Sequence, residues 1–385
     1  TMGLSKRTLS AVGAAALLLA ALPAHAEIKI GITASGTGPG AVLGQPQLKA
    51  VDTLPTEIAG EKITYIPLDD ASDPSKAAQN ARKLMLEDKV DVLIGSSLTP
   101  VTLPLIDMAA ENETPLMSMA AAAALVEPMD DKRKWVFKVV PNDDLMAEAI
   151  MKYIADSGVK RLGYIGVSDG YGEGYYNEVT RLAPELGIDI TTHEVYARND
   201  ASVTGQVLKV LATKPDAVFI ASAGSPAVLP QKALRERGYK GPIFQTHGVA
   251  SQSFIELGGD AVEGAIFAGE AFTVADDLPA DSPFKAPTTE FITKYKEATG
   301  EAPPIFAAHM YDSVRLLEAA IPQALEVGQP GTPEFRRALR SALEQSEGVY
   351  LNNGLSHITP DDHNGYDARS AFLIVVKDGK FQTTE

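Results

Sequence analysis

The chain of 385 residues contains no cysteine. This absence excludes disulfide bonds, thiol catalysis and thiolate metal ligands, so a fold of this size depends on apolar burial alone. Basic residues are also scarce, with 34 Lys and Arg against 50 Asp and Glu, and the formal net charge is −16. An acidic chain without a basic run is unsuited to nucleic acid, and we expect no nucleic-acid partner.

The first 26 residues have the pattern of a secretory signal peptide. Lys6 and Arg7 precede the apolar stretch Ala11–Leu22, and residues 24–26 (Ala-His-Ala) form a small-residue cleavage site. That stretch is too short to cross a bilayer, and no later one approaches roughly 20 apolar residues. We therefore expect cleavage after Ala26 and an exported protein.

Beyond residue 26, apolar runs of strand length alternate with helical patterns, which is typical of doubly wound parallel α/β sheets. The expected strands are Ile28–Thr33, Ile63–Leu68, Val92–Ile94, Leu116–Ser118, Val136–Val139, Leu162–Val167, Val218–Ala221, Ile243–Gln245 and Ala265–Ala268. The expected helices are Ser75–Glu87, Asp144–Ala155, Gly174–Glu185, Ala227–Arg237, Glu290–Thr299, Ala307–Ala324 and Pro333–Glu344. Roughly 360 residues exceed what one hydrophobic core usually serves, so two such domains are predicted.

A partial internal repeat also favours two similar halves. Residues 89–96 (KVDVLIGS) and 214–222 (KPDAVFIAS) each place an aspartate before an apolar run and a serine after it. In both, a later proline, Pro115 or Pro242, opens the next apolar run. A cleft between two such halves is the natural place for a ligand.

The turn that follows the first of these runs is a candidate anion site. Gly95–Pro100 (GSSLTP) offers hydroxyls and free backbone N–H groups where a helix is expected to begin. In open α/β sheets, ligands bind outside the carboxyl ends of the strands, which is where this turn would lie. A simple helix cap is the alternative interpretation.

Motifs along the whole chain beyond residue 26 resemble those of a known family. They are Ile28–Gly31, Thr37–Pro39, Leu43–Gly44, Gly95–Pro100, Pro115–Ser118, Asp169–Gly174, Gly248, Tyr311–Asp312 and Asp362–Gly365. In this order they resemble the solute-binding proteins of ABC importers, specifically the leucine/isoleucine/valine-binding family. The resemblance implies a type I periplasmic-binding fold of two hinged lobes that close on a ligand and then dock on a membrane permease.

The same resemblance implies how the chain is divided. Lobe one would comprise residues 27–141 and 272–350, and lobe two residues 142–271 and 351–385. A monomer without a cofactor or a metal ion is expected.

In the resembling family, two turns of lobe one hold the carboxylate of the ligand. Carried over by position, the holders are Thr99, with Ser97 close by, and the backbone of Ala120 and Ala122. A carboxylate that accepts several N–H and O–H bonds needs no Arg or Lys. The family carries a hydroxyl where this chain has Ala122, so that side-chain bond is lost.

A larger departure is found at His247. Amino-acid binders of the family carry an acidic residue there, which pairs with the ammonium group of the ligand. Burying an ammonium without such a partner costs several kcal/mol, which argues against an α-amino acid. An imidazole suits a keto, hydroxyl or carboxylate oxygen instead. A structural role for His247 in capping a turn is the alternative.

The remaining candidate residues would shape the ligand body. Ala121, within the alanine run 120–124, and Gly224, where amino-acid binders have a bulky aromatic residue, would leave room for a larger ligand. Tyr171 corresponds to the tyrosine of lobe two that covers the ligand. Phe306 falls at an aromatic position of the pocket, and Leu43 replaces a tyrosine. Core packing is the alternative role for Leu43 and Phe306.

These features predict a non-enzymatic solute-binding protein for a small carboxylate with an aromatic or branched apolar body. Benzoate derivatives, phenylpropenoates, phenylpyruvate and branched 2-oxo acids fit this description. A branched-chain amino-acid binder is the main alternative within the class, and a sensory ligand-binding module is one outside it. A lesser alternative is an exported serine esterase, because Gly166–Gly170 matches G-x-S-x-G with Ser168 as the nucleophile.

Overall fold

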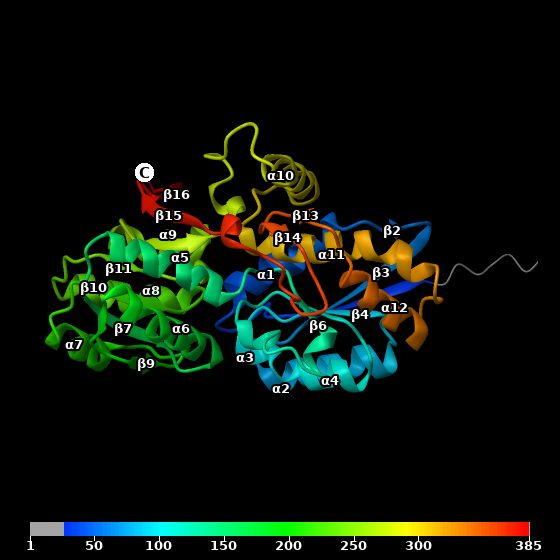
Figure 1. Ribbon diagram of the computed structural model, residues 1–385, viewed down its shortest axis with the longest axis horizontal. Coiled ribbons are helices and arrows are strands. Elements are labelled where there is room, and N and C mark those ends of the chain that lie inside the picture. The colour runs from blue at the N-terminus through cyan, green and yellow to red at the C-terminus, as the bar shows by residue number, and fades with distance from the viewer. Residues whose placement is uncertain (1–26, 385) are drawn as a thin grey trace, which may run out of the picture.

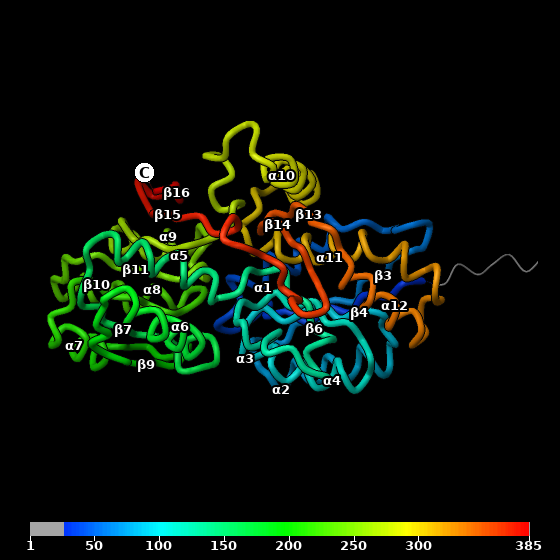
Figure 2. The backbone as a smooth tube through the Cα atoms, in the orientation of Figure 1, coloured from blue at the N-terminus to red at the C-terminus, as the bar shows by residue number. Residues whose placement is uncertain are grey.

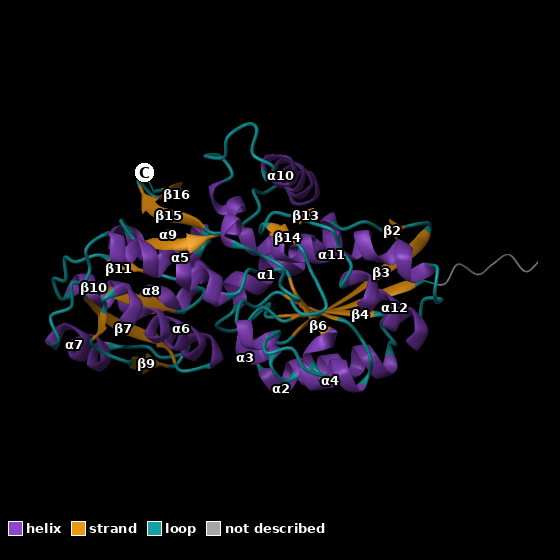
Figure 3. Ribbon diagram, in the orientation of Figure 1, coloured by secondary structure: helices purple, strands orange, loops and turns teal. Residues whose placement is uncertain are grey.

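The computed structural model describes residues 27–384, which form two α/β lobes lying side by side (Figure 1). The predicted signal peptide, residues 1–26, lies outside the described residues. In each lobe, helices cover a central sheet (Figure 3). Among residues 27–384, no helix combines the length and the apolar character that crossing a membrane requires.

The sheet of lobe one is parallel except at one edge. In spatial order its strands are β2 (Glu57–Ile58), β3 (Glu61–Asp69), β1 (Ile28–Ala34), β4 (Val92–Gly95), β5 (Leu116–Ser118) and β6 (Val136–Lys138). Only β2 runs antiparallel to its neighbour. The central strands β1 and β4 are almost entirely buried, as expected for parallel strands covered on both faces.

The sheet of lobe two adds an antiparallel hairpin to a parallel core. Its strands are β16 (Lys380–Thr383), β15 (Phe372–Lys377), β12 (Ile266–Gly269), β11 (Ile243–Phe244), β10 (Ala217–Ala221), β7 (Arg161–Val167) and β8 (Asp189–Ile190), and β9 (Glu194–Tyr196) also pairs with β7. The hairpin β15–β16 pairs antiparallel with β12. The expected parallel strands are confirmed, whereas this hairpin and the short pair β13 (Val349–Tyr350) and β14 (Leu355–Ser356) were not predicted.

Every predicted helix is present, with shifted ends. The helices are α1 (Ala41–Lys49), α2 (Pro74–Arg82), α3 (Thr99–Thr102), α4 (Leu105–Glu111), α5 (Asp143–Asp156), α6 (Gly170–Leu186), α7 (Thr204–Ala212), α8 (Val228–Glu236), α9 (Gln252–Gly258), α10 (Lys285–Thr299), α11 (Ile305–Leu325) and α12 (Pro333–Leu343). Side chains that cap the first N–H groups fix several starts, including Asp73 for α2, Asp169 for α6 and Thr332 for α12.

The internal repeat has the same geometry in both lobes. Asp91 accepts the N–H of Lys29 at the start of β1, and Asp216 accepts the N–H of Arg161 at the start of β7. The lysine that opens each copy of the repeat has a left-handed backbone conformation, with φ of 55° at Lys89 and 51° at Lys214. In both halves, therefore, an aspartate side chain that accepts a backbone N–H aligns the first strand of the sheet with its neighbour.

The chain passes between the lobes after β6, after β12 and between β14 and β15 (Figure 2). Asn364 joins two of these connections, because its Oδ1 accepts the N–H of Asn142 and its Nδ2 donates to the carbonyl of Val140, both at 2.8 Å. Phe272 N donates to the carbonyl of Asn352 at 3.3 Å. Linked connecting segments of this kind suit a hinge, and the lobe boundaries at residues 141, 271 and 350 stay a prediction.

Candidate ligand-binding site

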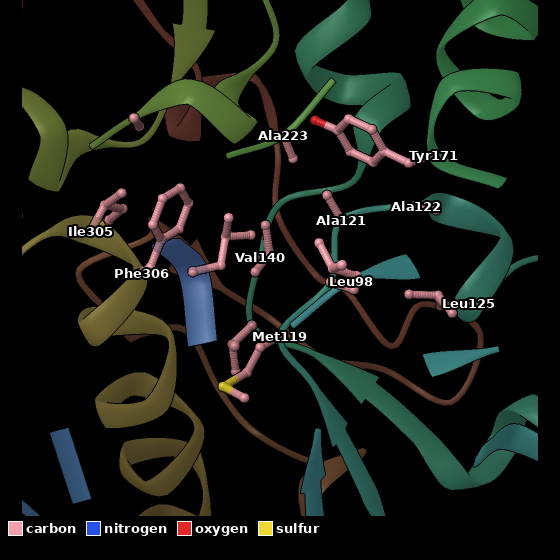
Figure 4. Packing of buried hydrophobic residues seen from close by; sticks show 14 of the residues in the cluster. Leu98, Met119, Ala121, Ala122, Leu125, Val140, Tyr171, Ala223, Ile305 and Phe306 are labelled. Atoms are coloured by element: carbon pink, nitrogen blue, oxygen red, sulfur yellow. The ribbon is translucent and has the colours of Figure 1, made fainter. Parts of the chain in front are cut away.

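A small cavity lies between the lobes, at the turns that follow β4, β5, β10 and β11. Its walls are Leu43, Ser97, Leu98, Thr99, Met119, Ala121, Val140, Tyr171, Arg198, Ala223, His247, Gly248, Phe306 and His309. Tyr171 of lobe two and Phe306 of lobe one approach the turns of lobe one from opposite sides (Figure 4). The cavity encloses about 20 Å³ in this conformation, which is room for about one water molecule. A ligand of several carbon atoms must therefore enter while the lobes stand further apart.

The structure brings most of the predicted site residues to this cavity. Leu43, Ser97, Thr99, Ala121, Tyr171, His247 and Phe306 line it, whereas Ala120, Ala122 and Gly224 do not.

Thr99 is the hydroxyl that remains available in the turn after β4. Its side chain is 2% exposed, and its Oγ1 has no hydrogen-bond partner among the described residues. Ser97 differs, because its Oγ accepts the N–H of Ser35 at 3.0 Å and donates to Oε1 of Gln47 at 2.5 Å. The hydroxyl of Ser97 therefore holds the turn in place, and that of Thr99 is left for a ligand.

Part of the second predicted carboxylate turn is engaged in internal hydrogen bonds. The N–H of Ala120 donates to Oγ of Ser118 at 3.1 Å, so it is not free for a ligand as the sequence suggested. The carbonyls of Ala121 and Ala122 accept the buried ammonium of Lys138. Burial lowers the pKa of Lys138 to about 8. Ala121 supplies apolar wall to the cavity, and the N–H of Ala122 stays a predicted donor to the ligand.

Leu43 fills the space that Gly224 leaves open. A Cβ atom built on Gly224 would lie 3.1 Å from Cδ1 of Leu43. The sequence predicted extra room for the ligand at Gly224, and this prediction is corrected. The missing aromatic residue of one lobe is compensated by an aliphatic side chain of the other.

Arg198 is a cation of the cavity that sequence reasoning missed. Its Nε donates to Oδ2 of Asp169 at 2.6 Å, and its Nη1 donates to the carbonyl of Ala223 at 3.3 Å. The guanidinium lies 5.9 Å from the centroid of the Tyr171 ring. Because a guanidinium carries about five N–H donors, some remain for a ligand after these bonds. Arg198 follows β9 in the sequence, and only the fold brings it beside Thr99 and Tyr171.

His247 is buried and neutral. Its Nδ1 lies 3.0 Å from the hydroxyl of Tyr175, while its Nε2 has no hydrogen-bond partner among the described residues. Burial lowers the pKa of His247 to about 4, against the attraction of Glu270. The ring is therefore an uncharged hydrogen-bonding group at pH 7, which agrees with a role toward an oxygen atom.

A family model described as periplasmic binding protein matches residues 27–380. The chain belongs to this family of periplasmic binding proteins. The predicted family and the type I fold, with two lobes around a cavity, are thereby confirmed. The protein is a ligand-binding component of the kind that serves ABC transporters.

The similarity to known proteins extends over almost the whole length of this periplasmic binding protein. A Leu/Ile/Val-binding protein of Rhizobium johnstonii is 26% identical to this chain. The alignment covers 98% of this chain and 99% of the Rhizobium protein. An extracellular ligand-binding receptor from Rhodopseudomonas palustris HaA2, whose structure is solved, is 69% identical in sequence to this chain. The two structures superpose with a TM-score of 0.92 over 93% of this chain and 100% of the receptor.

Two further solved structures share the fold of this binding protein at lower identity. A solute-binding protein of an ABC transporter from R. palustris, in complex with benzoate, is 20% identical, with a TM-score of 0.80 over 93% of this chain and 95% of its own. A branched-chain amino-acid binding protein of Streptococcus pneumoniae, in complex with isoleucine, is 19% identical. Its TM-score is 0.78 over 93% of this chain and 99% of the Streptococcus protein. At such identities the likeness shows the fold alone.

The esterase alternative finds little geometric support in this binding protein. Ser168 is exposed and stands before Asp169, which caps α6, so it is not at the first turn of that helix. None of the hydrogen bonds found within residues 27–384 joins its side chain to a histidine. Its backbone N–H donates to the carbonyl of Tyr196 at 2.8 Å and so aligns β7 with β9.

Proposed function

We propose that this periplasmic binding protein captures a small organic carboxylate with an aromatic or branched apolar body and delivers it to the membrane permease of an ABC importer. One observation carries the proposal. The unpaired hydroxyl of Thr99 faces the same buried cavity as the guanidinium of Arg198, and the walls around them are otherwise largely apolar.

Thr99 and Arg198 supply what a carboxylate needs. Hydrogen bonds from a cation or to an anion are shorter and stronger than neutral ones. Asp169 already compensates much of the charge of Arg198, so the anion is attracted mainly through directed N–H and O–H bonds. Thr99 belongs to lobe one and Arg198 to lobe two. A carboxylate bound by both would therefore stabilise the closed arrangement of the lobes.

The apolar part of the ligand would pack against five hydrophobic walls. These are Leu43, Leu98, Met119, Val140 and Phe306. Burying an aromatic ring or a branched chain against such walls contributes about 25 cal/mol for each Å² removed from water. Shape and apolar area would then decide which carboxylates bind well.

A branched-chain amino acid is the second candidate, because the Rhizobium relative is named as a Leu/Ile/Val-binding protein. Among the described residues that line the cavity there is no aspartate or glutamate, and the group at position 247 is a neutral imidazole. In an α-amino acid the ammonium lies next to the carboxylate, and here it would lie near the Arg198 guanidinium. This arrangement favours an acid without an amino group.

A thermal-shift screen of the ligand-stripped protein tests the proposal. Leucine and phenylalanine are compared with 4-methyl-2-oxopentanoate and phenylpyruvate, and benzoate and 4-coumarate are added. A ligand that binds only the folded protein stabilises it by about 2.7 kcal/mol at a hundred times its Kd, so the ranking of melting temperatures follows affinity. We expect shifts with oxo or aromatic acids and none with the amino acids. A shift with leucine alone would replace the proposal by the second candidate.

Thr99→Val is expected to weaken every carboxylate ligand by about tenfold or more, because a hydrogen bond to a charged group is lost while the shape is kept. Isothermal titration of the best ligand from the screen measures this change. Thr293→Val, on the exposed face of α10, is the matched control and should bind as the wild type does. An unchanged Kd in Thr99→Val would remove Thr99 from the site.

A further inference from the structure

A hydrogen bond between two buried rings lies directly behind the wall of the cavity. The hydroxyl of Tyr175 is 3.0 Å from Nδ1 of His247, and the other ring nitrogen, Nε2, has no hydrogen-bond partner among the described residues. Tyr175 is 1% exposed, and His247 is 3% exposed. His247 lines the cavity, whereas Tyr175 does not. Any influence of Tyr175 on a ligand must therefore pass through His247.

The fold holds the segments on both sides of this pair in place. Tyr175 is in the second turn of α6, and His247 opens a short helical turn after β11. One helical turn before Tyr175, Tyr171 packs edge-on against it, with ring centroids 5.2 Å apart. The hydroxyl of Tyr171 donates to Oγ1 of Thr246 at 2.8 Å, and that oxygen donates to the carbonyl of Ser222 at 2.7 Å. Helix α6 and the turn of His247 are thereby tied to each other beside the cavity.

The imidazole of His247 carries a single proton, and its surroundings decide which nitrogen holds it. In a neutral imidazole, one nitrogen is a donor and the other is an acceptor. The lowered pKa of His247, about 4, keeps the ring neutral at pH 7. Burial raises the pKa of Tyr175 well above its ordinary value, so the phenol keeps its proton and remains able to donate. The hydrogen bond between the two side chains can therefore run in either direction.

The direction from Tyr175 to His247 leaves fewer buried donors without a partner. The bond to Nδ1 of His247 is the one well-formed hydrogen bond of the Tyr175 hydroxyl among residues 27–384. If Nδ1 held the proton, the phenol would lose this acceptor, and the neighbouring hydroxyl of Tyr171 is already engaged with Thr246. A buried donor without a partner costs about 1–3 kcal/mol. The proton of the imidazole therefore belongs on Nε2, where it forms an N–H donor that the protein itself does not use.

We propose that Tyr175 is a positioning residue that holds His247 in the tautomer with its proton on Nε2, so that the cavity wall presents a fixed N–H donor. The consequence for the ligand rests on the proposed function. An N–H group can bind an oxygen of the ligand, but it offers no lone pair to an ammonium. Glu270 attracts a proton to the ring, yet neither of its carboxylate oxygens accepts a hydrogen bond from the described residues. Tyr175 thereby favours an acid without an amino group, although it does not line the cavity.

Nitrogen NMR of the isotope-labelled, ligand-stripped protein tests the tautomer without reference to any ligand. The protonated and unprotonated nitrogens of a neutral imidazole have well-separated chemical shifts, and the His247 signals are those lost in His247→Gln. We expect the proton on Nε2 alone in the wild type at pH 7. In Tyr175→Phe, which keeps the ring and removes the hydroxyl, the two nitrogens should share the proton. Tyr176→Phe is the matched control, because Tyr176 stacks on His193, with centroids 3.4 Å apart, and should leave the tautomer of His247 unchanged.

Isothermal titration tests the consequence for the ligand. We expect the wild type to bind 4-methyl-2-oxopentanoate more tightly than leucine, and Tyr175→Phe to lose about fivefold of this preference, the effect of one hydrogen bond. Tyr176→Phe should keep the preference.

The outcomes separate this inference from the proposed function. A proton on Nδ1 in the wild type, as expected if Tyr175 donates to Tyr171 instead, would overturn the inference and leave the carboxylate proposal standing. The same holds if Tyr175→Phe keeps the wild-type tautomer. A changed tautomer with an unchanged preference would remove the effect of Tyr175 on the ligand. If the wild type prefers leucine, the proposed function itself fails, and the NMR result still decides the tautomer.

Discussion

Gly172→Ala is expected to destabilise the protein by at least about 3 kcal/mol, the cost typical of severe overpacking in a core. A Cβ atom at position 172 would lie 1.9 Å from the carbonyl oxygen of Val167, far inside contact distance. Gly172 is in the first turn of α6, where the helix passes closely over the end of β7. Because the obstacle is backbone, a side-chain rotation cannot relieve it, and α6 must move. Urea unfolding followed by circular dichroism measures the loss.

Gly205→Ala is the matched control for this prediction. Gly205 also lies near the start of a helix, α7, but a Cβ atom there meets nothing within 4 Å. Helix propensity alone then predicts a gain of up to about 1 kcal/mol, because alanine restricts the unfolded chain and favours the helix. Opposite signs at the two glycines would support the close approach of α6 to β7. A Gly172→Ala variant as stable as the wild type would contradict it.

The movement of α6 also has a functional consequence. Asp169, which caps α6, holds Arg198, and Tyr171 covers the cavity. A displaced α6 should therefore weaken the binding of carboxylates in whatever fraction of Gly172→Ala still folds. The glycine acts on the site only through the position of the helix.

The parallel core could be predicted from the sequence because buried strands carry a strong local signal. Strand β4 and strand β10 are short apolar runs bounded by an aspartate and a serine or glycine, and both occur where expected. The structure adds the reason for the repeated aspartates. Asp91 and Asp216 accept backbone N–H groups of a neighbouring strand, so the pattern encodes register as well as strand position.

The C-terminal hairpin was missed although the sequence carries a signal for it. The apolar run Phe372–Lys377 is followed by Asp378-Gly379, a dipeptide favoured in tight hairpin turns, and then by β16. Helix α1 was missed for a different reason. Gly44 and Pro46 weaken its helical pattern, and packing against the rest of lobe one compensates for the poor propensity.

The candidate site was predictable where a single turn determines it and unpredictable where distant segments meet. Thr99 belongs to one such turn, and its role follows from local pattern and resemblance. Arg198 lies far from Thr99 in the sequence, and only the folded chain places both at one cavity.

Acidification is expected to destabilise the protein through His247, and this contribution can be isolated. Burial lowers the pKa of His247 to about 4, against an ordinary value of 6.5 in the unfolded chain. Between these values the unfolded chain binds more protons than the folded one, so the stabilising contribution is complete above pH 6.5 and is lost as the pH falls. The linkage relation gives a loss of about 2.5 kcal/mol by pH 4.5.

Other buried groups change in the opposite sense over the same range. Burial raises the pKa of Asp143 and of Asp312 to about 6, so these carboxyls bind protons in the folded state and offset part of the acid loss. A comparison of wild type with His247→Gln cancels their effect. We expect the free energy of unfolding of His247→Gln to improve relative to wild type by about 2.5 kcal/mol between pH 7 and pH 4.5.

The matched control for this measurement is His357→Gln, at an exposed histidine, whose difference from wild type should stay constant over the same range. A constant difference for His247→Gln as well would mean that the imidazole at position 247 is protonated as readily in the folded protein as in the unfolded chain.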